Sequence, residues 1–152
     1  MKDTDSGWGT SGNVWHWVLP PSQLVQVCVV VDCDVAARAL DAQLGVLPEV
    51  AMFRLDDPVR AHRAWSRLYS RDRDTALGCE IAQQMRRLPQ GVLLLLWSSC
   101  PADMDWLGGV AGHRVEASLR WAGFDGPAQT QRFVERVLAI TRTMVLERIS
   151  AW

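Results

Sequence analysis

The stretch that decides the fold reads LVQVCVVVDCD and covers residues 24–34. Its segment Leu24–Val31 is nearly all apolar and rich in β-branched residues, which is typical of a short strand buried on both faces. Asp34 then offers an N-cap for a helix over Val35–Leu44, and Gly45 provides the end of that helix. This succession predicts a strand followed by a crossover helix, the unit from which parallel sheets are built.

The rest of the chain continues this alternation of strands and helices. The expected strands are Val50–Leu55, Gly91–Trp97 and Arg114–Trp121, and the expected helices are Pro58–Tyr69, Thr75–Leu88 and Pro127–Ile149. The strand over residues 114–121 alternates apolar with polar side chains, which favours an edge position with one solvated face.

Strands separated by helices form parallel sheets through right-handed crossovers. We therefore predict an α/β fold with a three- to four-stranded, mostly parallel sheet, flanking helices and a long C-terminal helix. A ferredoxin-like arrangement of the first strand–helix–strand unit stays open. Residues 1–13, rich in Gly, Ser and Asp, are expected to form a flexible N-terminal tail, and residues 14–152 a single domain.

Composition excludes several classes of function. The chain has 152 residues, with 16 Lys plus Arg against 17 Asp plus Glu, and this balance argues against a dedicated nucleic-acid binder. Lys2 is the only lysine, so the sequence offers no Walker A loop, Schiff-base lysine or kinase lysine. No secretion signal is visible and the apolar runs are too short to span a membrane, so we expect a cytoplasmic protein without membrane association.

Acidic and hydroxyl side chains follow the apolar strands. Asp32-Cys33-Asp34 comes directly after the first strand, and Ser98 follows Trp97. Because ligands bind at the carboxyl ends of parallel strands, these residues define a candidate site that carboxylates could turn into a Mg²⁺ site.

The D-x-D pattern and Ser98 resemble the first two motifs of haloacid-dehalogenase-like phosphatases. The resemblance implies a nucleophile at Asp32, an acid–base residue at Asp34 and a phosphoryl-binding hydroxyl at Ser98. The family's lysine and its later acidic pair have no counterpart here, and a plain strand end with a helix N-cap is the alternative. The same stretch is similar to the acidic pocket of response-regulator receivers, although Trp97 and Ser98 stand where the acceptor aspartate is expected.

Other clusters give weaker signals. Cys33 and Cys100 follow the ends of two strands, but neither they nor the histidines show zinc-ligand spacing, so we expect no metal and no cofactor. A stripe of arginines at helical spacing predicts either a phosphate-binding face or, as we prefer, a solvated one. The stripe consists of Arg60, Arg63, Arg67 and Arg71.

The C-terminal helix carries two apolar seams, wider than one sheet face usually buries. The first seam consists of Phe133, Val137, Ile140 and Met144, and the second of Val134, Leu138, Val145 and Ile149. Tryptophans at both ends of the chain add aromatic surface, which is enriched where proteins bind proteins. They are Trp8, Trp15, Trp17 and Trp152. We expect another protein to bind the first seam and Trp152, a homo-oligomer being left open, although core packing explains the same pattern.

Residues 27–97 resemble the middle of RecA-like domains, closest to the P-loop-less branch that includes the SulA cell-division inhibitors. The matching features are the CVVVDCD strand end, the Leu-Gly helix end, the motif Gly78-Cys79-Glu80 and the strand ending at Trp97. The resemblance implies a bacterial pseudoenzyme, an NTPase-like sheet that has lost its nucleotide site and binds a protein. We therefore expect a regulatory, non-catalytic interaction protein (an adaptor, inhibitor or accessory subunit). The alternatives are a Mg²⁺-dependent phosphoryl-transfer enzyme and a receiver-like domain that cannot be phosphorylated.

Overall fold

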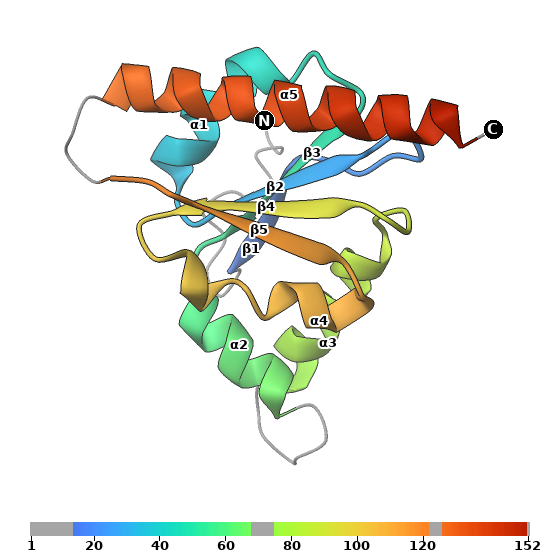
Figure 1. Ribbon diagram of the computed structural model, residues 1–152. Coiled ribbons are helices and arrows are strands. Elements are labelled where there is room, and N and C mark those ends of the chain that lie inside the picture. Colours follow the sequence, from blue (N-terminus) through green and yellow to red (C-terminus); the bar gives the residue numbers. More distant parts are fainter. Residues whose placement is uncertain (1–13, 68–74, 122–125, 152) are drawn as a thin grey trace, which may run out of the picture.

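The computed structural model describes residues 14–67, 75–121 and 126–151. They form an α/β domain with helices on both faces of one sheet (Figure 1). The strands are β1 (Trp15–Leu19), β2 (Val27–Val31), β3 (Val50–Leu55), β4 (Leu93–Ser98) and β5 (Arg114–Leu119). The helices are α1 (Asp34–Leu44), α2 (Pro58–Ser66), α3 (Thr75–Arg86), α4 (Leu107–Ala111) and α5 (Gly126–Ser150), with a short 3-10 turn over Pro101–Asp103.

The sheet order is β1-β3-β2-β4-β5, with β2 to β5 parallel and β1 antiparallel to β3. The predicted α/β class is confirmed, but the sheet has five strands rather than three or four. The additional strand is β1, whose WHWVL sequence is too short to show a clear period. The tail expected over residues 1–13 lies outside the described residues.

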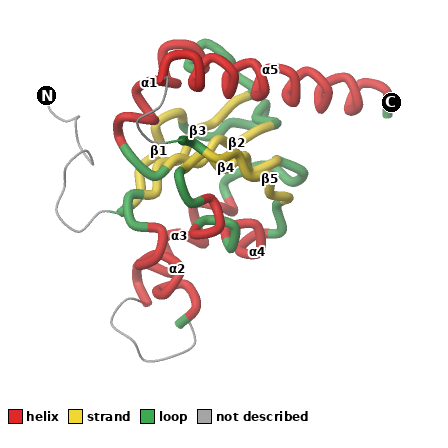
Figure 2. Tube along the Cα trace, turned by 60° about the vertical axis from the view of Figure 1, so that its left-hand side comes forward, coloured by secondary structure: helices red, strands yellow, loops and turns green. Residues whose placement is uncertain are grey.

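Strand β2 is buried on both faces because successive side chains point to opposite sides of the sheet. Val27, Val29 and Val31 pack into one core, with α1 and α5. Cys28 and Val30 pack into the other, with α2, α3 and α4. Figure 2 shows these two helical layers on either side of the strands. The apolar run of residues 24–31 therefore supplies both cores, as expected for a central parallel strand.

Helix starts follow local chemistry, with one correction. Asp57 caps α2 by accepting a hydrogen bond from the Arg60 backbone N–H at 3.1 Å, and Pro58 occupies the first turn. The N-cap of α1 is Cys33, not Asp34 as predicted. Asp34 lies within the first turn, where its carboxylate pairs with arginines, and this position orients it toward the strand ends.

Candidate functional site

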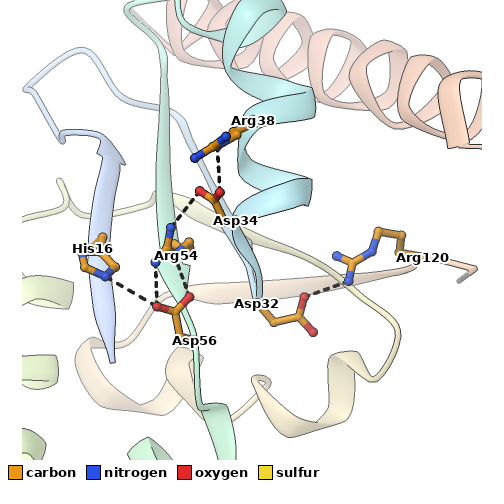
Figure 3. A network of polar contacts seen from close by, with 7 residues as sticks. All are labelled: His16, Asp32, Asp34, Arg38, Arg54, Asp56 and Arg120. Atoms are coloured by element: carbon orange, nitrogen blue, oxygen red, sulfur yellow. Dashed lines mark hydrogen bonds and ion pairs between the residues drawn. The ribbon is translucent and has the colours of Figure 1, made fainter. Parts of the chain in front are cut away.

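The carboxyl ends of β2 and β3 bring three aspartates to one edge of the sheet (Figure 3). Asp32 and Asp34 follow β2, and Asp56 follows β3. The sequence predicted Asp32 and Asp34 at this edge. It did not predict Arg54 and Arg120, which lie among them and neutralise their charge. The site is therefore a network of ion pairs rather than an acidic cluster.

Arg54 is the centre of this network. Its side chain is 8% exposed, and its Nε and Nη2 donate to the two carboxylate oxygens of Asp56 at 2.6 and 2.8 Å. Its Nη1 donates to Oδ1 of Asp34 at 3.0 Å, while the exposed Arg38 contacts the other oxygen of Asp34 at 2.7 Å. A guanidinium in this fork geometry ties the ends of β3 and α1 together.

His16, on β1, extends the network to the edge of the sheet. Its Nε2 lies 3.5 Å from Oδ2 of Asp56, and the residue is buried. Burial lowers the pKa of His16 and the Arg54 charge lowers it further, against the opposing effect of Asp56. The neutral imidazole is thus the form that the folded protein favours.

Arg120 occupies the same edge beyond β5. Its Nη2 donates to Oδ1 of Asp32 at 3.0 Å and its Nη1 to the Trp97 carbonyl at 3.2 Å. The guanidinium lies 5.5 Å from the centre of the Trp97 ring, which stacks on Phe133 with ring centres 4.6 Å apart. Arg120 therefore connects the end of β2, the end of β4 and the aromatic pair beneath α5.

The residues predicted for phosphoryl transfer thus lie at one edge but are committed to other contacts. Asp32 and Asp34 are each paired with arginine, and Ser98 is buried with its Oγ accepting from the Cys100 backbone N–H at 3.0 Å. A Mg²⁺ ion would have to compete with guanidinium groups for both carboxylates. Among the described residues, no group of three or more His, Cys, Asp or Glu side chains could hold a metal ion.

The cysteines are all free thiols. Cys28 is buried in the core, and burial raises its pKa. Cys100 is exposed, but a hydrogen bond with the Asp103 side chain and the negative charge of that carboxylate raise its pKa. A raised pKa disfavours the thiolate that nucleophilic catalysis requires.

The C-terminal helix corrects part of the predicted partner surface. Phe133 and Val137 are buried against β2 and β4, and Ile140 and Met144 pack partly buried against the same core. This first seam holds α5 on the sheet, so its buried members are not open to a partner. Trp152, the remaining predicted contact, lies outside the described residues.

The tryptophans are distributed differently from the prediction. Trp15 and Trp17 are half-buried on β1, where both rings contact Phe53. The indole N–H of Trp15 donates to Glu80 at 3.2 Å and that of Trp17 to Gln84 at 2.8 Å. They therefore cover the core over α3. Trp121, whose role the sequence did not reveal, is 64% exposed.

Searches of family models, of curated proteins and of solved structures find no match to this chain. Within the described ranges, no helix is both long enough and apolar enough to cross a membrane.

Proposed function

We propose that this protein is a non-catalytic interaction domain that binds another protein through the outer flank of α5. The observation that carries the proposal is a set of apolar side chains left in solvent on that helix. Leu138, Leu146 and Ile149 are 39%, 56% and 62% exposed, although the opposite side of the same helix is buried in the core.

The spacing of this surface fits a helical partner. Leu138, Arg142, Val145 and Ile149 are separated by four, three and four residues, the spacing of a coiled-coil seam. We call these four residues and Leu146 the α5 flank. Arg142 stands within the row, so the complementary helix would present apolar side chains with an acidic residue opposite Arg142.

The shape of the molecule supports the same proposal. Figures 1 and 2 both show the last turns of α5 extending beyond the ends of the strands. Those turns include Leu146 and Ile149 and are reachable from several directions. An amphipathic helix could therefore lie along them without displacing α5 from the sheet.

The ion-paired strand ends agree with a scaffold role for the sheet. Arg54 links Asp34 of α1 to Asp56 after β3, beside His16 of β1, and Arg120 links Asp32 after β2 to the Trp97 carbonyl of β4. These contacts hold together the strand ends at one edge of the sheet on which α5 packs. The NTPase-like origin implied by the resemblance of residues 27–97 belongs to this proposal, which predicts no nucleotide hydrolysis.

The test is quantitative co-purification from cells that naturally make the protein. The double variant Leu146→Asp/Ile149→Asp places carboxylates on the α5 flank, whereas Thr143→Asp adds one to an exposed position of the same helix that is not part of the α5 flank. We expect wild type and Thr143→Asp to co-purify with a stoichiometric partner. The amount of that partner recovered with the double variant should be lower by about tenfold or more.

Light scattering during size-exclusion chromatography separates the alternatives. Circular dichroism must show that all three proteins are folded. A partner that binds the double variant as well as wild type would refute the assignment of the α5 flank. A concentration-dependent dimer that the double variant abolishes would identify a second copy of the chain as the occupant instead.

A further inference from the structure

A cavity of about 810 Å³ opens at the carboxyl edge of the sheet, between α1, the first turns of α5 and the end of β4. Its lining includes Cys33, Ala39, Trp97, Arg120, Trp121 and Gln129. The volume falls in the range of small-molecule sites. The cavity also lies at the topological switch point of the sheet, between the neighbouring strands β2 and β4. The helix that follows β2 covers one face of the sheet, and the helices that precede β4 cover the other. Open α/β sheets bind ligands at such a point.

The charge at the cavity comes from the Arg120–Asp32 ion pair, of which only the arginine lines the wall. Arg120 is the one charged side chain among the described residues that line the cavity. Asp32, its ion-pair partner, is not part of the lining. The remaining walls are apolar or neutral, as with Val35, Ala36 and Gln43. A buried or half-buried cation in such a wall favours a ligand of opposite charge.

Arg120 retains hydrogen-bonding capacity toward this space. A guanidinium has five N–H donors, and two of those of Arg120 are used, one on Asp32 and one on the Trp97 carbonyl. Its side chain is 19% exposed, so it is held in place yet reachable. A carboxylate or phosphate can accept from the other donors without displacing Asp32.

Trp121 supplies an aromatic surface at the same cavity. Gln129 of α5 fixes its backbone, since the Gln129 amide accepts from the Trp121 N–H and donates to the Trp121 carbonyl at 3.0 Å. The side chain nevertheless remains largely exposed. An uncovered indole on a fixed backbone, beside an apolar wall, offers a stacking surface for a flat ring.

We propose that this cavity binds a small organic anion, with its carboxylate or phosphate group on Arg120 and its flat apolar body between α1 and Trp121. This binding is independent of the α5 flank, because the cavity lies against the opposite end of α5. The site explains why an arginine and an exposed tryptophan stand next to each other at the end of β5.

Isothermal titration calorimetry with three probes of one ring system tests the proposal. The probes are naphthoate, naphthyl phosphate and the uncharged naphthamide. We expect at least one anion to bind about tenfold or more tightly than naphthamide, a difference of about 1.4 kcal/mol or more. The headgroup that binds better decides between a carboxylate and a phosphate ligand. Failure of both anions to bind, or equal binding of naphthamide, overturns the proposal.

Two variants localise the binding. Arg120→Gln should remove the preference for the anion, whereas Arg148→Gln, which changes an exposed arginine of α5 outside both the cavity and the α5 flank, should leave it unchanged. If Arg120→Gln fails to fold, Ala39→Phe serves instead, because Ala39 is an exposed residue that lines the cavity and a phenyl ring there fills space. Ala39→Phe should weaken the bound anion about tenfold or more, and an unchanged affinity contradicts the site.

Discussion

Replacing Arg54 by methionine is the sharpest test of the ion-pair network. The substitution keeps an unbranched side chain as long as the stem of the arginine but removes its charge-assisted hydrogen bonds, among them two to Asp56 and one to Asp34. It leaves Asp56 without its arginine and Asp34 with the exposed Arg38 in place of two arginines. Breaking a buried pair on one side costs about 3 to 5 kcal/mol.

The expected cost here is smaller because water reaches the aspartates. Their side chains are 36% and 32% exposed, so solvent screens part of the lost attraction. We expect Arg54→Met to lower the free energy of unfolding by about 2 to 3 kcal/mol. For a domain of this size that corresponds to a fall in the melting temperature of roughly 4 to 12 °C.

Arg38→Met is the matched control, because Arg38 pairs with the same Asp34 but its side chain is 78% exposed. Its loss should cost no more than about 0.5 kcal/mol. Urea unfolding followed by tryptophan fluorescence measures both variants. Equal effects, or a cost below about 0.5 kcal/mol for Arg54→Met, would refute the claim that the buried guanidinium organises the strand ends.

Three further outcomes are expected. Gly108→Ala should destabilise the protein by about 1 to 3 kcal/mol, because the added Cβ would lie 2.8 Å from the backbone oxygen of His113. A Cβ at Gly109 meets nothing within 4 Å, so Gly109→Ala should be neutral or stabilising. Thermal unfolding measures both variants. Because the pKa of His16 is lowered in the folded protein, the unfolded chain binds more protons than the folded one as pH falls below about 6.5. The free energy of unfolding of wild type should therefore decline below that pH, and it should decline less in His16→Gln. Urea unfolding repeated across pH measures both. Asp103→Asn should speed alkylation of Cys100 by iodoacetamide near neutral pH, as read by peptide mass spectrometry, and an unchanged rate would contradict the role given to Asp103.

Local sequence patterns predicted most of the fold because they are read along single elements. The apolar run before Asp32 specifies a strand buried on both sides, and the period of residues 127–149 specifies a helix. The alternation over residues 114–119 correctly indicated an edge strand. Strand β1 was harder to predict, because its pairing with β3 depends on partners about 35 residues away, such as Phe53 opposite Trp17.

The candidate site was predicted only in part, since its electrostatics depend on residues from separate strands. The carboxylates were visible as strand-end residues. Arg54 was hidden inside an apolar strand and Arg120 at the end of an alternating one, and nothing local connects either to an aspartate. A charged residue within the otherwise apolar VAMFRL segment was the one available signal, because a buried arginine requires a partner.

Helix α5 shows the same limit. Its two apolar seams were recognised, but periodicity alone does not say which seam faces the sheet. The Phe133 ring stacks on the Trp97 ring, and this contact places the first seam against the sheet. With that seam on the sheet, Leu138, Leu146 and Ile149 lie on the side of the helix that is exposed to solvent.

Site-specific photo-crosslinking tests the central claim most directly. A benzophenone amino acid placed at Leu146, on the α5 flank, is compared with the same group at Thr143, in the full chain produced in its natural cells. We expect one dominant crosslinked protein at position 146 and little at 143, with the attachment mapped to an amphipathic helix of that protein. Equal crosslinking at both positions, or none at position 146, would contradict a binding role for the α5 flank.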